Sequence, residues 1–291
     1  MEKEQEHSKA KWASISIIGV SRSGYYSWLQ ERELRKARLE AYEARVKQIF
    51  EDGRGHYGAE RICGVIRLRG ERASFPVVKR IMATYGLVSS HCRKKQRSLT
   101  DSRRARGDEY ISHLEGLEIN RPFQVLSSDI TYIRTDEGFD YLCQIRDVFT
   151  NVVLGHSQQA RMTKDLVLKT LTSIQNRWHC PPGTIFHSDR GGQYTALDTQ
   201  RLIASFGWQQ SYSRVGEPGD NAWSESFFAN LKKEIVHWNH FTTREEARYQ
   251  IFTYIETYYN RKRVQKRLGY LSPIDYLNQW TEKQTANLNV A

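Results

Sequence analysis

Residues 185–194 read I-F-H-S-D-R-G-G-Q-Y, and residues 220–233 read D-N-A-W-S-E-S-F-F-A-N-L-K-K. Asp189 closes a short apolar run that is typical of a buried strand, and two glycines turn the chain immediately afterwards. Glu225 lies in a segment whose apolar residues recur at helical spacing. The stretch therefore predicts one acid at the end of a strand and another on a helix, with 35 residues between them.

A third acid, Asp129, ends the apolar-rich run 123–128, and 59 residues separate it from Asp189. Two acids at strand ends and one on a helix can meet at one point, where the three carboxylates could not all stay ionised without a cation. Oxygen ligands without a His or Cys cluster suit magnesium or manganese. Two such ions about 3.5–4 Å apart can bind the attacking and the leaving oxygen of a phosphodiester. We therefore expect Asp129, Asp189 and Glu225 to form a metal-binding catalytic site.

Four ordered motifs surround these acids: S-S-D-I-T-Y-I at 127–133, F-H-S-D-R-G-G-Q-Y-T at 186–195, S-R-V-G-E-P-G-D-N-A-W-S-E-S-F-F-A-N-L-K-K-E at 213–234 and L-G-Y-L-S-P at 268–273. Together they resemble the bacterial transposases of the insertion-sequence-three family, in particular the product of the second reading frame. The DDE-type catalytic core of that family is similar to retroviral integrase. The resemblance runs from about residue 19 to residue 276.

The resemblance implies a transposase that uses Asp129, Asp189 and Glu225 as a D-D-E triad, with Mg²⁺ or Mn²⁺, as two ions, for its cofactor. From the residues alone, Asp140 or Asp147 could take the place of Asp129. Only the motif around Asp129 selects it.

From residue 121 onward, short strands replace charged helices. Three successive strands followed by alternating helices and strands predict an α/β fold in which helices cover a mixed sheet. The family resemblance implies that this is a ribonuclease-H-like sheet, preceded by an all-α helix-turn-helix region. Strands are expected near 123–133, 139–148, 151–159, 183–188 and 208–213, and helices near 163–178, 195–206, 222–238 and 245–260.

Together with the family resemblance, the changes in pattern and charge along the chain predict a short N-terminal helical segment (1–30), a helical, helix-turn-helix-like DNA-binding region (31–90), a basic linker (91–120), an integrase-like catalytic core (121–240), and a C-terminal helix with a basic tail (241–291). Ser21 is expected to cap a short helix that precedes a separate charged helix over 30–51. Residues 54–88 have the helix-turn-helix layout, with Ser74 as the cap of the second helix. Such a helix can lie in a DNA major groove. A helical hairpin with solvated basic residues is the alternative.

The chain holds 44 Lys and Arg against 33 Asp and Glu, a net charge of +11 that points to a polyanionic partner. Residues 1–120 carry +8 of this charge, so we expect them to be the main grip on double-stranded DNA. On the predicted helix of Glu225, Asn221 and Lys232 fall on roughly the same face as the acid, where they can approach DNA. His187 is a candidate auxiliary residue that positions water or phosphate, or it is only structural. The candidate DNA-binding residues are Lys232, Asn221, Arg190, Lys79, Arg80, Arg93, Lys94, Lys95, Arg97, Arg261 and Arg263.

The four cysteines are isolated, with no C-x-x-C pair, so a zinc site or a disulfide framework is not expected and a reducing cytosol fits. The polar N-terminus shows no secretory signal. Together with the resemblance, this implies a protein of the bacterial cytoplasm associated with the nucleoid.

We expect the chain to hydrolyse one strand at each transposon end and to join the freed 3′-hydroxyl to target DNA. It would act as a homo-oligomer, at least a dimer, on the terminal repeats, and its partners could include the product of the upstream reading frame. Two alternatives stay open at this stage. The chain could be a non-catalytic DNA-binding accessory or regulator of transposition, or a nuclease of the same fold that only hydrolyses DNA or RNA.

Overall fold

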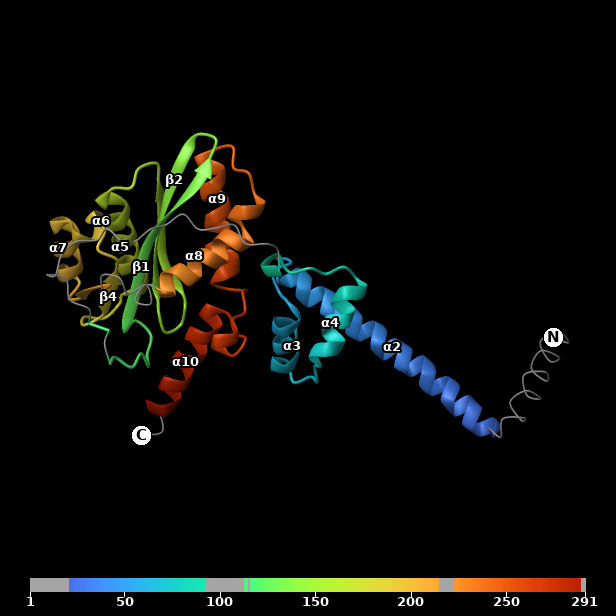
Figure 1. Cartoon of the computed structure of the whole chain (residues 1–291). Helices are drawn as coiled ribbons and strands as arrows, with labels where there is room; N and C mark the ends of the chain where they lie inside the picture. The colour runs from blue at the N-terminus through green and yellow to red at the C-terminus, as the bar shows by residue number, and fades with distance from the viewer. Residues whose placement is uncertain (1–20, 93–112, 115, 215–221, 289–291) are drawn as a thin grey trace.

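The computed structural model describes residues 21–92, 113–114, 116–214 and 222–288. A five-stranded sheet lies at the centre of the larger, C-terminal part, and a group of helices forms the N-terminal part (Figure 1). No helix within the described ranges combines the length and the apolar character needed to cross a membrane.

The sheet has the strand order β3-β2-β1-β4-β5. The first three strands form an antiparallel meander, while β4 and β5 join the β1 edge in parallel. The parallel connections run through helices, as parallel strands require. The strands span Val125–Thr135 (β1), Gly138–Asp147 (β2), Val153–Gln159 (β3), Ile185–Ser188 (β4) and Gln209–Tyr212 (β5). The mixed sheet with its covering helices matches the predicted ribonuclease-H-like fold.

Helices cover both faces of the sheet, and each face has its own apolar core. On one face, Cys143 and Ile145 of β2 pack with α5 (Lys164–Trp178) and α7 (Leu197–Ser205). On the other face, Leu142 packs with α8 (Ala222–Glu234) and with the helical segment that starts at α9 (Arg244–Thr253). Alternate residues of β2 therefore serve opposite cores, as the pleat of a strand dictates.

Several helices differ in their bounds from the predicted ones. The two helices expected on either side of residue 30 form one helix, α2 (Arg22–Asp52), because no breaker separates them; the Ser21 side chain does cap it, accepting from the Gly24 N–H. The helix expected at 195–206 begins only at residue 197, because the backbone of Ala196 is extended and separates it from the short helix α6 before it. The remaining helical segments are α6 (Gly192–Thr195), the 3-10 turns η1 (Ser90–Cys92), η3 (Val236–Trp238) and η5 (Lys266–Leu268), the π-helix η4 (Tyr254–Tyr259) and α10 (Pro273–Leu288).

The N-terminal helices pack around a small core of their own. The end of α2 joins α3 (Ala59–Leu68) and α4 (Phe75–Thr84), and Ile49, Ile62 and Val78 meet at the centre. Ser74 lies at the predicted cap position of α4, although its side chain makes no capping hydrogen bond. α3, a turn and α4 thus give the helix-turn-helix layout, with apolar residues inside.

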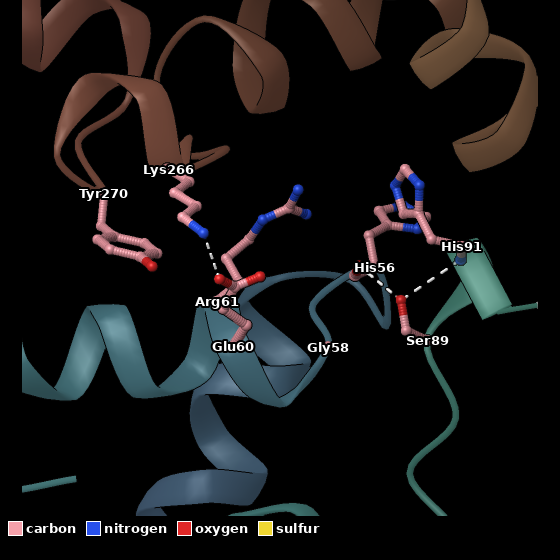
Figure 2. A pocket seen from close by; sticks show the side chains of 8 residues that line it. All are labelled: His56, Gly58, Glu60, Arg61, Ser89, His91, Lys266 and Tyr270. Carbon is pink, nitrogen blue, oxygen red and sulfur yellow. Dashed lines mark hydrogen bonds and ion pairs between the residues drawn. The ribbon is translucent and has the colours of Figure 1, made fainter. Parts of the chain in front are cut away.

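The helical region is docked against the C-terminal part by direct contacts. The Tyr57 hydroxyl donates to the Lys262 carbonyl at 3.0 Å and accepts from the Val264 N–H at 2.9 Å. The Tyr258 hydroxyl donates to the Gly53 carbonyl at 2.8 Å. Figure 2 shows a shallow pocket at this junction, lined by His56, Gly58, Glu60, Arg61, Ser89, His91, Lys266 and Tyr270.

Gly64 lies at this junction, where it contacts the Tyr270 ring. A Cβ added to Gly64 would lie 2.2 Å from a ring carbon, closer than atoms can approach. We expect Gly64→Ala to lower the free energy of unfolding by about 1–3 kcal/mol through overpacking. In a Tyr270→Ala background the same change should instead stabilise the chain, because alanine favours a helix by about 1 kcal/mol over glycine. Denaturant titration of the four chains measures both effects, and equal effects in the two backgrounds would refute the contact.

Candidate active site

The register of the sheet brings Asp129 and Asp189 to the same level on neighbouring strands. β1 and β4 are parallel, and Ser127 is aligned with His187. Each acid follows its aligned residue by two positions, and Asp129 is on the same face of β1 as Ser127. Adjacent strands lie about 4.8 Å apart. Asp189 comes directly after the last residue of β4, as the apolar run before it predicts.

Glu225 lies in the first turn of α8, and that turn contacts the strands of both aspartates. The Ser224 hydroxyl is 2.5 Å from the hydroxyl of Ser127 on β1, and both side chains are fully buried. The Trp223 ring meets the His187 ring of β4 edge to face at 6.3 Å. The three elements that carry the acids therefore meet at one end of the sheet.

The Glu225 side chain is exposed. In the part of the chain that the structure describes, no three His, Cys, Asp or Glu side chains lie close enough together to hold a metal ion. The structure thus aligns the two aspartates and brings the helix of Glu225 to them, but it does not gather all three carboxylates. Their chemistry, oxygen donors only, fits a hard divalent cation.

The aspartates occupy a partly desolvated site. Burial raises the pKa of Asp189, and the hydrogen bond that its Oδ1 accepts from the Gly191 N–H at 3.0 Å lowers it again in part. Asp129 accepts from the Ile130 N–H at 2.8 Å. Burial, Cys143 and then both aspartates raise the pKa of the Tyr194 hydroxyl well above its ordinary value.

Lys232 supplies a positive charge beside Asp129. Its Nζ lies 5.6 Å from the centre of the Tyr132 ring. Burial lowers the pKa of Lys232, while the charge of Asp129 raises it. The structure thus places a half-buried ammonium near the strand of Asp129.

The two alternatives to Asp129 have structural partners elsewhere. Asp140 is fully buried and accepts two hydrogen bonds from Arg248, at 2.6 and 3.0 Å. Asp147, also buried, accepts from the Phe123 N–H at 2.9 Å and from the Thr150 N–H at 2.8 Å. Asp140 thus binds a residue of α9, and Asp147 binds the backbone of two loops. Of the three aspartates, Asp129 therefore stays the candidate metal ligand.

The remaining candidates fall into separate places. Lys79 and Arg80 are exposed on α4, and Arg261 is exposed after η4. Arg190 is half-buried, and its Nε donates to the Ser213 carbonyl at 3.0 Å. His187 is buried with its two ring nitrogens 3.0 and 3.1 Å from serine hydroxyls, an arrangement that favours its structural role. Five candidates lie outside the described residues: Arg93, Lys94, Lys95, Arg97 and Asn221.

The prediction that Arg263 contacts DNA is wrong in this structure. Its residue surface is 2% exposed, and its guanidinium binds the Glu234 carboxylate with distances of 2.7 to 3.0 Å. The cause is Glu234 itself, an acid at the buried end of α8 that needs a cation. Residues 261–267 read R-K-R-V-Q-K-R, and this basic run gave no sign of that partner.

Sequence reasoning also missed polar residues beneath α8. Gln144 and Arg146 of β2 are buried and contact the first turn of this helix. A signal was present, because Gln144 and Arg146 alternate with the apolar residues Cys143 and Ile145 in the buried part of the strand.

Three family models match the chain. An HTH-like domain covers residues 36–96, and two models described as integrase core domain cover residues 119–218 and 225–280. Among solved structures, the catalytic core domain of HTLV-2 integrase in complex with magnesium is similar with a TM-score of 0.41 and 14% identity, over 53% of this chain and 96% of that one.

Curated relatives align along most of the chain. Transposase InsF for insertion sequence IS3A of Escherichia coli (strain K12) is 34% identical over 284 residues, which cover 96% of this chain and 97% of that protein. The transposase for insertion sequence element IS904 of Lactococcus lactis subsp. lactis (strain IL1403) is 36% identical, over 81% of this chain and 93% of its own length. With its helix-turn-helix region and its integrase core, the chain belongs to the transposases of the insertion-sequence-three (IS3) family.

Proposed function

We propose that this transposase cuts one DNA strand at each end of its insertion sequence and joins the freed 3′-hydroxyl to a second phosphodiester. Asp129, Asp189 and Glu225 would hold the divalent metal. The observation that carries the proposal is the alignment of Asp129 and Asp189 on parallel strands, together with the contacts of the first turn of α8 with both strands.

The chain's own part in the reaction is to position charge. When bound, Mg²⁺ or Mn²⁺ would stabilise the charge that develops on the attacking and leaving oxygens. Asp129 and Asp189 would bind it from the sheet, and Glu225 from the helix. In the first step water displaces a 3′-oxygen from phosphorus, and in the second the freed 3′-hydroxyl displaces another in the same way. Neither step needs a covalent bond to a side chain.

The test is incubation of the purified full chain with Mg²⁺ or Mn²⁺ and labelled duplexes that carry the ends of the element. Nicked ends followed by joined products are expected. Nicked ends alone would indicate a nuclease, and specific binding without cleavage would indicate an accessory or regulatory protein. A sizing experiment on the same complexes tests for the homo-oligomer that pairing of two DNA ends would require.

Lys232 is proposed to bind a DNA phosphate next to the acids. We expect Lys232→Ala to weaken binding to every duplex alike and to reduce the dependence of log affinity on log salt by about 1, because one counterion fewer is released. Fluorescence anisotropy over a salt series measures the slope. Lys164→Ala, which removes an exposed lysine that pairs with Asp198, is the control, and an unchanged slope for Lys232→Ala would remove Lys232 from the interface.

A further inference from the structure

The two sheet strands next to the first turn of α8 present a set of buried polar side chains toward it. In the β1–β2 pairing, Asp129 is opposite Gln144 and Ser127 is opposite Arg146. Directly opposite residues of an antiparallel pair share a face. Apart from Asp129, these side chains belong to residues that are at most 2% exposed. This part of the sheet is therefore polar, although it adjoins the apolar core under α8 and α9.

These side chains bind the first turn of α8 by hydrogen bonds. Gln144 Nε2 donates to the Ser224 hydroxyl at 3.2 Å, and the same hydroxyl is the one 2.5 Å from Ser127. An Arg146 Nη2 group donates to the Trp223 carbonyl. Farther along the helix, Phe227, Phe228 and Leu231 make apolar contacts. Apolar burial is non-directional, whereas hydrogen bonds have preferred directions, so the polar contacts are the ones that fix how the first turn is placed and rotated.

This arrangement costs free energy, which argues against a role in stability alone. Among the residues that the structure describes, no hydrogen-bond partner reaches the buried Gln144 Oε1 or Arg146 Nε. Within the described ranges Arg146 also forms no ion pair with a carboxylate. Burying an unmatched polar group costs about 1–3 kcal/mol, and a charged group costs more. Apolar side chains of similar size would hold the helix against the sheet without that cost.

We propose that Gln144 and Arg146 are positioning residues that set the first turn of α8, and with it the Glu225 carboxylate, relative to Asp129 and Asp189. This inference rests on the proposed function, because it takes Glu225 to be a metal ligand. It adds two residues that act on the site through hydrogen bonds to Ser224 and Trp223. Groups that orient ligands in this way typically change metal affinity or activity by about 10–100-fold when they are altered.

The test uses Mn²⁺ alone as the probe, with the full chain, and measures binding from the electron paramagnetic resonance signal of free Mn²⁺. Gln144→Leu is expected to weaken Mn²⁺ binding about 10-fold. Arg146→Met, which keeps a long side chain, should act in the same direction and serves if the first variant fails to fold. The matched control is Gln158→Leu on β3, because Gln158 also has a buried oxygen without a partner but lies opposite Leu142 rather than Asp129. It should bind Mn²⁺ as the unaltered chain does.

A combination with Glu225→Gln separates this inference from the proposed function. If Gln144 acts through Glu225, Gln144→Leu should weaken Mn²⁺ binding in the unaltered chain but have no further effect beside Glu225→Gln. Equal weakening in both backgrounds, or none in either, would overturn the positioning role while Glu225→Gln alone still loses affinity. If Glu225→Gln itself leaves Mn²⁺ binding unchanged, the ligand set of the proposed function fails, and the positioning role fails with it.

Discussion

Replacement of Asp189 by asparagine is expected to reduce DNA cleavage by roughly a thousandfold or more, while binding of terminal DNA stays within about twofold. A carboxylate that holds a catalytic metal supports several kcal/mol of transition-state stabilisation, and each 1.36 kcal/mol is worth about a factor of 10 in rate. Asparagine keeps the shape and can still accept the hydrogen bond from the Gly191 N–H. Single-turnover cleavage of a labelled terminal duplex measures the rate, and anisotropy without metal measures binding.

The control for this experiment is Asp198→Asn in the first turn of α7. Asp198 is an exposed acid that pairs with Lys164, so its loss removes the same charge from the surface and should leave cleavage unchanged. Cleavage by Asp189→Asn at a rate close to that of the unaltered chain would remove Asp189 from the catalytic site.

The pKa of Asp189 gives the same variant a second expected effect, on stability. Burial raises the pKa of the Asp189 carboxyl group in the folded chain above its value in the unfolded chain, so folding favours the protonated form of this acid. The metal-free protein therefore loses stability as the pH rises from the unfolded pKa, about 3.9, through the folded pKa. Asp189→Asn should thus raise the melting temperature at pH 7 and have less effect below pH 4. Thermal unfolding in chelator across that range tests this, and a lower melting temperature at pH 7 would contradict it.

The sequence predicted the sheet well because its signals are local. The apolar run before Asp189 and the glycines after it define β4 and the turn without help from distant residues. The helix-turn-helix layout could also be predicted, since Val78 and Ile81 recur at helical spacing and the exposed basic residues 79 and 80 lie between them. Features that depend on a neighbour in space were harder to predict from the sequence. Arg263, Gln144 and Arg146 all contact residues of α8. No pattern along the chain indicates that this helix lies next to them, so their roles could not be predicted from the sequence.

For the aspartates, the residues alone left three candidates for one position in the site, and the fold distinguishes between them. Asp129, Asp140 and Asp147 are all acids in or at the ends of neighbouring strands. Their surroundings differ. Asp140 on β2 accepts a hydrogen bond from Arg248, and Asp147 at the end of β2 accepts one from the Phe123 N–H. Only parallel pairing with β4 brings an acid of β1 level with Asp189. That pairing joins strands about 60 residues apart in sequence, so spacing alone could not reveal it.

Replacement of Arg263 by methionine is expected to lower the free energy of unfolding by about 3–5 kcal/mol, because it leaves a buried carboxylate without its cation. Glu234 is fully buried on α8 and also accepts from the Tyr254 hydroxyl at 2.8 Å, and its Oε1 is 2.6 Å from His91 Nε2 in the helical region. Burial raises the pKa of Glu234, but the positive charge of Arg263 and the hydrogen bond with His91 outweigh burial and hold this pKa well below its usual range. A depressed folded pKa means that the pair stabilises the chain above the unfolded pKa and loses this contribution as the pH falls.

Denaturant unfolding at pH 7 measures the loss, and Arg261→Met, an exposed arginine two residues away, is the control and should change stability by less than about 0.5 kcal/mol. The double variant Glu234→Met with Arg263→Met should recover most of the stability, since replacing a buried ion pair with apolar side chains of similar volume is often neutral. It should not recover the contact with His91, so limited proteolysis of the helical region should be faster in the double variant. A single Arg263→Met variant as stable as the control would show instead that Arg263 is free to leave Glu234, and would return it to the candidates for DNA binding.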